Sequence, residues 1–383
     1  MVTAYISKLK IAIVYDWFDK WGGVERVLLT LHKMFPKADF FSSYFDPQKA
    51  SWACQFDIKT SFIQKLPKLI RESRIVSLPL YPFAFEAFDF SGYNLVVSVS
   101  SSFAKGVITK PKTVHICYLL TPTRFLWHQE KDYLSAGNQR ILSPYIKYLK
   151  DWDQVSAQRP DYIISLSKTV ADRCRRYYQR ESEVIYPPFN EDKWSNIKNT
   201  NKISNITKNK YFLVVSRLEP YKKVDLVIDV FSRLKDKYLI VVGKGSEEKK
   251  LKKIAGVNIQ FLKDLTDEQL GYLYINCQAL IMPQEEDFGL VALEGQFFGC
   301  PVIAYKKGGV TEIVIDDRTG IFFDSQTEKS LSDALERFNK ISYNLRASTL
   351  ALGKKNVERF NRRIFEDKFK TFIILKIKDQ NAK

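Results

Sequence analysis

The sequence predicts an α/β protein built from two doubly wound domains, and three observations support this fold class. The chain has 383 residues, which exceeds what one ordinary hydrophobic core accommodates and is enough for two domains. Hydrophobic residues make up 45% of it, a share typical of globular rather than disordered proteins. Short β-branched runs alternate with segments of helical periodicity, as in parallel sheets that are covered by helices.

The first series of alternating elements predicts a domain over residues 1–190. Lys10–Trp17 is a continuous apolar run, typical of a strand that is buried on both faces, and Gly22 and Gly23 break the chain after it. Apolar residues recur at helical spacing from Val24 onward. The other elements expected here are strands at Asn94–Val99, Val114–Leu120, Asp161–Leu166 and Glu183–Tyr186 and a helix at Lys168–Tyr178.

A second series follows a polar segment. Asn196–Lys210 is rich in Asn and Lys and predicts a linker or surface loop, so the second domain is expected at residues 205–358. Residues 359–383 carry an apolar stripe that includes Phe365 and Phe369, and we expect this helix to pack back on the first domain. The elements expected in the second domain are strands at Tyr211–Ser216, Tyr238–Val242, Asn258–Leu262, Ala279–Met282 and Pro301–Ala304 and helices at Val224–Leu234, Asp267–Ile275 and Gly289–Phe298.

Charge and cysteine content narrow the class of function. The formal net charge of +17 is expected to attract the protein to phosphates on a nucleic acid, an anionic lipid or a charged substrate. The 5 cysteines are far apart and lack zinc-ligand spacing, so we expect free thiols in a reducing cytoplasm and no metal site. The chain starts without a signal-peptide pattern, and no apolar run reaches about 18 residues, so a cytoplasmic protein that does not span a membrane is expected.

Candidate site residues follow strand ends in the second domain, where open α/β sheets bind ligands. Arg217 and Lys222 come directly after a strand, and two cations there could clamp a diphosphate. Glu286 precedes a predicted helix start, where backbone N–H groups suit phosphates and carboxylates suit sugar hydroxyls. Glu294 lies inside an otherwise apolar helix, where an unpaired carboxylate is costly. A solvated basic loop and acids that offset a helix dipole are the alternative interpretations.

Together these motifs resemble a known family. The patterns R-x4-K at residues 217–222, E-D-F-G-x4-E at 286–294 and G-G-V-x-E at 308–312 look like the donor domain of retaining glycosyltransferases of family 4. This family, also called glycosyl transferases group 1, has the GT-B fold, in which two Rossmann-like domains face a central cleft. Residues 22–27 resemble its first glycine loop. The resemblance covers nearly the whole chain in the family's order and does not identify the sugar.

The resemblance implies a role for each matching residue. Arg217 and Lys222 would hold the donor diphosphate, Glu286 would lie against the donor sugar, and Glu294 would bind the ribose. The family needs no metal or other cofactor, because these cations and helix dipoles neutralise the leaving diphosphate. The implied catalytic residues are Arg217, Lys222 and Glu286, and the implied donor-binding residues are Gly22, Gly23, Arg217, Lys222, Glu286, Phe288, Gly289, Leu290 and Glu294.

The implied reaction is transfer of a mannose-, glucose- or rhamnose-type sugar, with retention of configuration, from a GDP-, UDP- or dTDP-linked donor to a lipid-linked or saccharide acceptor. Such a reaction serves polysaccharide or glycolipid biosynthesis. One alternative is a sugar-nucleotide epimerase of the same fold. Another is a non-enzymatic, basic nucleic-acid-binding protein. The sequence disfavours this last class, because it has no zinc-finger spacing, aromatic RNA-binding motif or basic arm.

One position departs from the family pattern. Leu120 stands where the family has a histidine before Thr-Pro, and that histidine helps to position the donor sugar near its sixth carbon. One hypothesis is that Leu120 favours a 6-deoxy sugar, since an apolar side chain meets a methyl group better than an alcohol. The alternative is a tolerated substitution, with His115 or His128 compensating. Arg124, just beyond the Thr-Pro turn, is a further cleft candidate for an anionic acceptor.

A basic segment in the first domain suggests a second kind of partner. Lys65, Lys68, Arg71 and Arg74 recur every three residues between apolar side chains, although Pro67 limits or breaks a helix there. Such a segment could rest on the anionic inner face of a membrane and bring the site to a lipid-linked sugar. A solvated basic surface over a normal core is the alternative.

Overall fold

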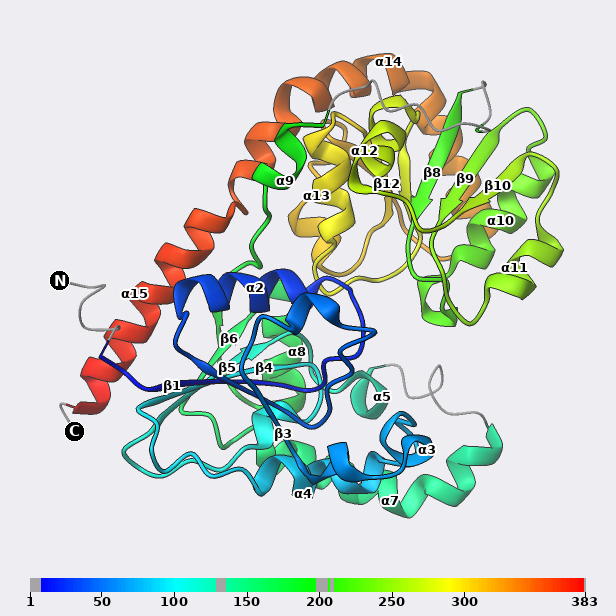
Figure 1. Cartoon of the computed structure of the whole chain (residues 1–383). Helices are drawn as coiled ribbons and strands as arrows, with labels where there is room; N and C mark the ends of the chain where they lie inside the picture. The colour runs from blue at the N-terminus through cyan, green and yellow to red at the C-terminus, as the bar shows by residue number, and fades with distance from the viewer. Residues whose placement is uncertain (1–7, 129–135, 198–205, 207–209, 382–383) are drawn as a thin grey trace. The chain divides into compact units, whose positions relative to one another are not determined.

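The computed structural model describes residues 8–128, 136–197, 206 and 210–381, and the chain divides into two compact units (Figure 1). Unit 1 comprises Met1–Pro188 and Arg362–Lys383, and unit 2 comprises Phe189–Asn361. The first division thus falls ahead of the expected linker at Asn196–Lys210, most of which lies outside the described residues.

Unit 1 is built on a seven-stranded parallel sheet. Its central strands are fully buried, in agreement with the apolar runs that predicted them. The short strands at Asp39–Ser42 and Ile58–Thr60 were not predicted, because four and three residues give too little periodicity. In sheet order the strands are β3 (Ile58–Thr60), β2 (Asp39–Ser42), β1 (Ile11–Tyr15), β4 (Leu95–Ser100), β5 (Val114–Leu119), β6 (Tyr162–Ser165) and β7 (Glu183–Val184).

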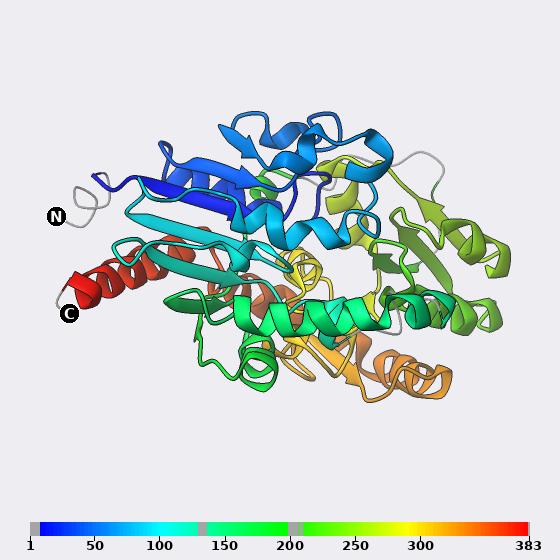
Figure 2. The same cartoon turned by 90° about the horizontal axis from the view of Figure 1, so that it is seen from below.

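Helices cover this sheet, and the last helix of the chain is one of them. The ring of Tyr118 on β5 lies 5.8 Å from that of Phe365 and 6.1 Å from that of Phe369, so the apolar stripe of the final helix is buried within unit 1. Figures 1 and 2 show this red helix beside the strands of the unit. The helices of unit 1 are α2 (Val24–Met34), α3 (Lys68–Arg71), α4 (Tyr81–Glu86), α5 (Arg124–Trp127), α7 (Ala136–Ser156), α8 (Lys168–Tyr178) and α15 (Arg362–Asn381).

Unit 2 repeats the architecture with a six-stranded parallel sheet. In sheet order its strands are β10 (Ile259–Leu262), β9 (Tyr238–Val242), β8 (Tyr211–Val215), β11 (Leu280–Met282), β12 (Val302–Tyr305) and β13 (Gly320–Phe323). Its helices are α9 (Asp192–Ser195), α10 (Val224–Arg233), α11 (Glu248–Ile254), α12 (Asp267–Asn276), α13 (Leu290–Phe297) and α14 (Glu328–Glu358). Phe212, Phe231 and Phe338 join β8, α10 and α14 in one buried core.

Both sheets reverse their strand order beside their first strand. In unit 1 the chain adds strands on one side of β1 and then continues from β4 on the other side, and in unit 2 β8 and β11 have the same relationship. Such a switch point separates the loops that leave the carboxyl ends of the two strands and is where open α/β sheets bind ligands. The predicted fold class is therefore confirmed for both units. In the described part of the chain, no helix combines the length and apolar character needed to cross a membrane.

Candidate functional site

The predicted cations of unit 2 lie in the loop that leaves β8. A short 3₁₀ turn, Pro220–Lys222, follows the strand and ends at Lys223, whose φ of 53° lies in the left-handed region. Arg217 is exposed, and its Nη2 atom donates a hydrogen bond of 2.5 Å to the hydroxyl of Tyr221. The side chain of Lys222 is only 10% exposed. A lysine this buried requires a partner, because burial of an unpaired charge is costly.

That partner is Glu286, in the loop that leaves β11. The Nζ atom of Lys222 lies 2.5 Å from Oε1 of Glu286, and the side-chain amide of the buried Gln284 donates to the same oxygen at 2.8 Å. Because β8 and β11 are neighbours at the switch point, the sheet brings these two loops together. The structure thus joins two of the three predicted catalytic residues and places Arg217 in the same loop as Lys222.

The glycines at residues 308–309 pack against the loop that carries Glu286. The backbone N–H of Gly309 donates to the carbonyl of Glu286 at 2.8 Å, and Gly308 has a left-handed φ of 84°. A Cβ atom on Gly308 would lie 2.3 Å from that same carbonyl oxygen. Glycine is therefore required here by conformation and by close backbone contact.

The start of α13 contains three more residues of the predicted donor set. Gly289 is the N-cap with a φ of 108°, and Leu290 is the first helical residue. The ring of Phe288 is buried and packs edge-on against Phe360 at 5.4 Å, so this side chain contributes to the core of unit 2. What this segment can offer a ligand is the backbone N–H groups at the helix start.

Glu294 is held by a residue that the sequence analysis missed. Its Oε2 atom accepts a hydrogen bond of 2.8 Å from the hydroxyl of Tyr274, on α12. Tyr274 is completely buried, and Glu294 is 4% exposed. A polar group on a buried helix face signals that a partner exists but does not identify it. The bond crosses from one helix to another, so helical spacing alone could not reveal it.

The two glycines of unit 1 follow β1. Gly23 is the N-cap of α2, with φ −88° and ψ −31°, and neither it nor Gly22 has a positive φ. A Cβ atom on Gly22 would come 3.3 Å from Oε2 of Glu25, which is close but not prohibitive. Backbone conformation therefore does not require glycine at either position. That these glycines leave space for a bound ligand remains a prediction.

Asp16, directly after β1, organises the switch point of unit 1, and the sequence analysis missed this residue as well. Asp16 is completely buried and accepts hydrogen bonds from the backbone N–H groups of Ser101, Phe103 and Ala104, at 2.7, 2.8 and 2.7 Å, in the loop after β4. Burial raises the pKa of the Asp16 carboxyl, while these hydrogen bonds act in the opposite direction. An aspartate that ends a buried apolar strand was the available sequence signal.

A buried ion pair extends this framework to the Thr-Pro turn. Lys105 and Asp153 are 2% and 1% exposed, and their Nζ and Oδ1 atoms lie 2.5 Å apart. Asp153 also accepts hydrogen bonds of 2.7 Å from the hydroxyls of Thr123 and Tyr178. The pair therefore anchors the segment between Leu120, at the end of β5, and α5.

Leu120 and Arg124 flank this anchored turn. Both side chains are half-buried, and Arg124 is the first residue of α5. His115 is the second residue of β5, about 16 Å along the strand from Leu120. Its Nε2 atom lies 2.8 Å from the hydroxyl of Ser98, and burial lowers its pKa to about 3. His115 is thus a neutral core residue, and the hypothesis that it replaces the family's histidine is wrong.

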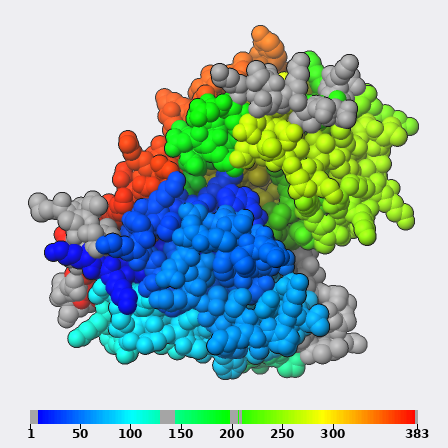
Figure 3. All heavy atoms as spheres, viewed as in Figure 1, coloured from blue at the N-terminus to red at the C-terminus, as the bar shows by residue number. Residues whose placement is uncertain are grey.

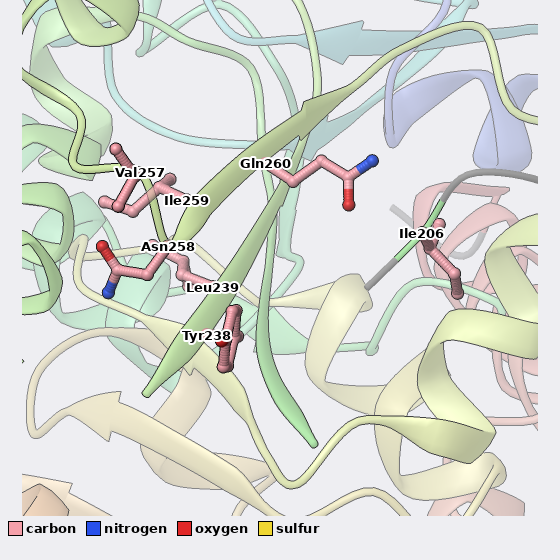
Figure 4. A pocket seen from close by; sticks show the side chains of 7 residues that line it. All are labelled: Ile206, Tyr238, Leu239, Val257, Asn258, Ile259 and Gln260. Carbon is pink, nitrogen blue, oxygen red and sulfur yellow. The ribbon is translucent and has the colours of Figure 1, made fainter. Parts of the chain in front are cut away.

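The cavity shown in Figure 4 lies at a different edge of unit 2. It has a volume of about 440 Å³ and is lined by the first residues of β9 and β10, including Tyr238 and Gln260. Asn258 in its wall donates through its side-chain amide to three backbone carbonyls, so its polar group already serves the fold. The cavity therefore lies at the amino ends of strands, whereas Lys222 and Glu286 lie at the carboxyl ends.

Comparison with known proteins finds a family match within unit 2. Residues 196–355 match the family model described as glycosyl transferases group 1. The chain is 29% identical over 205 residues to alpha-1,3/1,6-mannosyltransferase ALG2 of Dictyostelium discoideum, covering 43% of this chain and 48% of that protein. It is 33% identical over 132 residues to a D-inositol 3-phosphate glycosyltransferase of Mycobacteroides abscessus, covering 32% and 30%. The chain thus spans about half the length, or less, of these curated relatives.

Solved structures match over almost the entire chain. Sucrose-phosphate synthase from Thermosynechococcus elongatus has a TM-score of 0.75 at 17% identity and covers 97% of this chain and 100% of its own. Anabaena HepE in complex with UDP has a TM-score of 0.71 at 17% identity and covers 95% and 99%. At such identities the likeness concerns the fold. The fold is that of GT-B glycosyltransferases, and the segment of this chain that is similar to the glycosyl transferases group 1 family is residues 196–355.

Proposed function

We propose that the protein is a metal-independent, retaining glycosyltransferase that moves a sugar from a nucleotide-sugar donor to a lipid-linked or saccharide acceptor. The observation that carries this proposal is the meeting of Lys222 and Glu286 at the switch point of unit 2, inside the segment that matches the family. Mannose is the first sugar to test, because curated relatives are named mannosyltransferases.

Each site residue has a chemical task in this proposal. The guanidinium of Arg217 and the ammonium of Lys222 neutralise the charge that develops on the leaving diphosphate. The acceptor hydroxyl attacks the anomeric carbon on the face from which the diphosphate departs. The new glycosidic bond forms as the bond to the phosphate oxygen breaks, and a phosphate oxygen takes the hydroxyl proton. Glu286 accepts hydrogen bonds from donor-sugar hydroxyls, and Glu294 accepts them from the ribose.

The first experiment is thermal stabilisation by a panel of GDP-, UDP-, dTDP- and ADP-sugars, followed by transfer assays with the best donor. A ligand at a hundred times its dissociation constant stabilises the folded state by about 2.7 kcal/mol, which gives a clear shift in Tm. We expect one nucleotide class to shift the wild type and not Glu294→Ala or Lys222→Ala. The anomeric proton of the product, observed by NMR, then reports retention. Donor conversion without an acceptor would instead indicate an epimerase, and no donor shift together with tight nucleic-acid binding would refute the transferase.

We also propose that unit 1 rests on an anionic membrane surface through residues 62–83. Pro67 divides this segment into a 3₁₀ turn, Phe62–Lys65, and the short helix α3, so a single amphipathic helix is absent. Arg74 is bound to Asp19 at 2.6 Å and its guanidinium lies 4.2 Å from the ring of Trp17, so it is already partly engaged within the protein. The segment instead offers exposed apolar side chains beside the exposed Lys65 and Lys68, as part of the surface seen in Figure 3. The exposed apolar residues are Phe62, Leu69, Ile75, Val76 and Phe83.

Sedimentation with vesicles tests this surface. Leu69 is 87% exposed, and each nearby Lys or Arg contributes about 1 kcal/mol at an anionic surface. We expect the protein to sediment at low salt with vesicles of phosphatidylglycerol and phosphatidylethanolamine, and not with pure phosphatidylcholine. Leu69→Glu should weaken this binding, whereas Tyr343→Glu, at an 86% exposed position on α14, should not. Equal binding by all three proteins, or no binding by the wild type, would contradict the proposed surface.

A further inference from the structure

We infer that Tyr274 is a positioning residue that sets the orientation of the Glu294 carboxylate and thereby makes the site prefer ribonucleotide donors to 2′-deoxyribonucleotide donors. The inference rests on the proposed function, in which Glu294 accepts hydrogen bonds from the ribose. It extends that function by assigning a specificity role to a residue of α12, outside the motifs that define the donor site.

The bond between the two residues joins the helix that precedes β11 in the chain to the helix that follows it. Tyr274 lies in the last turn of α12, β11 follows, and Glu294 lies in the middle of α13. The Tyr274 hydroxyl donates to Oε2 of Glu294 at 2.8 Å, and both side chains are buried. Since α12 and α13 contact each other and α13 also contacts β11, the packing of three elements fixes the two ends of this bond.

The phenol ring itself is clamped by aromatic neighbours. The ring of Phe298 stacks on that of Tyr274, with a centroid distance of 6.0 Å and an interplanar angle of 12°. Trp194 of α9 meets Tyr274 edge-on at 6.5 Å and Phe298 edge-on at 5.6 Å. Trp194 is 1% exposed, so this cluster is part of the core. The direction in which the Tyr274 hydroxyl points is therefore set by packing rather than by the bond to Glu294.

A neutral donor suits a carboxylate that has to bind a ligand hydroxyl. An ionised carboxylate is an acceptor with about four lone-pair sites. A lysine partner would offset its charge, whereas a tyrosine is a neutral donor that occupies one of these sites and restrains the orientation of the group. Ribose presents its 2′- and 3′-hydroxyls side by side as donors. A 2′-deoxyribose lacks one of them, so the fixed carboxylate would lose a partner in a buried site, and sites of this kind reject such analogues strongly.

The test compares matched nucleotides by isothermal titration calorimetry. The probes are UDP, GDP, ADP and dTDP, which is itself a 2′-deoxyribonucleotide, and the 2′-deoxy counterpart of whichever ribonucleotide binds best. We expect the wild type to prefer the ribonucleotide by about tenfold or more, the range for hydrogen bonds to charged groups. Tyr274→Phe should lower this preference at least threefold, mainly through weaker ribonucleotide binding, and Glu294→Ala should abolish it.

Tyr211→Phe is a matched control. Tyr211 is buried in the same unit, and its hydroxyl donates to the carbonyl of Leu273, next to Tyr274, at 3.1 Å. The Tyr211→Phe variant should be less stable than the wild type but should keep the same ribose preference, because a structural defect weakens the binding of both nucleotides equally. An unchanged preference in a folded Tyr274→Phe variant, or an equal loss in Tyr211→Phe, would overturn the inference. Binding of dTDP alone, whose sugar is a 2′-deoxyribose, would overturn the inference and leave the proposed function standing. Failure of the wild type to bind any of the four nucleoside diphosphates would refute the proposed function itself, and the role of Tyr274 with it.

Discussion

The Nζ atom of Lys222 lies 2.5 Å from Oε1 of Glu286, so a cation in the loop after β8 is paired with an acid in the loop after β11. Both side chains are largely buried, at 10% and 18% exposure, which strengthens their attraction relative to a pair in water. In the proposed site a bound diphosphate competes with Glu286 for Lys222. When no ligand is bound, the Glu286 carboxylate neutralises Lys222. Once the diphosphate takes its place, this carboxylate becomes available to the donor sugar.

This competition predicts opposite effects for substitutions of the two partners. Lys222→Ala should weaken binding of the nucleoside diphosphate by about ten- to a hundredfold, the range for losing a hydrogen bond to a charged group. Glu286→Gln should leave diphosphate affinity unchanged or higher, because the side chain that competes with the phosphate for Lys222 has lost its charge. It should also reduce sugar transfer, because Glu286 is proposed to bind the hydroxyls of the donor sugar. Calorimetry and transfer assays measure the two quantities. Lys307→Ala is the control, since Lys307 is 57% exposed and bound to Glu285 at 3.2 Å in the same region. Parallel losses of affinity in both site variants would refute the competition.

The buried pair of Lys105 and Asp153 should be a major contributor to the stability of unit 1. Lys105→Met removes one partner and leaves a buried carboxylate, which typically costs about 3–5 kcal/mol. Lys59→Met is the comparison, because Lys59 is 47% exposed and lies 3.2 Å from Asp39, and exposed pairs contribute at most about 1 kcal/mol. Urea unfolding, followed by tryptophan fluorescence, measures both. Similar shifts of the unfolding midpoint in the two variants would show that burial does not decide how much each ion pair contributes to the free energy of unfolding.

His115 predicts a specific pH dependence. Burial lowers its pKa from 6.5 to about 3 in the folded state, so between these values the unfolded chain binds a proton that the folded chain does not. The stability that neutral His115 contributes is complete above pH 6.5 and is lost as the pH falls toward 3, by up to about 5 kcal/mol. Proton NMR can follow this directly, since the chain has 3 histidines. We expect the His115 ring to stay neutral until acid unfolding, and a titration near pH 6.5 in the folded protein would contradict this.

Leu120→His tests the hypothesis of a 6-deoxy donor. If the apolar side chain accommodates the methyl group at the sixth carbon, the wild type should have a higher kcat/KM with a 6-deoxy donor than with its 6-hydroxy counterpart on the same nucleotide. The substitution should shift this preference toward the alcohol by about tenfold, since a group of this size changes binding by about 1–3 kcal/mol. Leu126→Met, at a buried position in α5, controls for general disturbance of the turn. A wild type that prefers the 6-hydroxy donor would eliminate the hypothesis.

The course of the chain was largely predictable because it depends on local pattern. The apolar run at Lys10–Trp17 became β1, and the runs near residues 95 and 114 became β4 and β5. Two of the elements that were missed are short, since β13 and α11 have four and seven residues, but α7, with 21 residues, was missed as well. The segment around Pro67 was expected to be an interrupted helix, and it consists of a 3₁₀ turn followed by the four-residue helix α3, because proline cannot donate the backbone hydrogen bond that continuation requires.

The sequence by itself determined the two α/β units, the order of the motifs and the residue types at the donor site, because periodicity, glycine positions and motif spacing are properties of neighbouring residues. Only the tertiary structure decided which of these residues meet. The strand order places β8 beside β11 and so brings Lys222 to Glu286 across 64 residues, and helix packing brings Tyr274 to Glu294 across 20. Such contacts depend on how the chain crosses each sheet and packs its helices, and no local pattern encodes that.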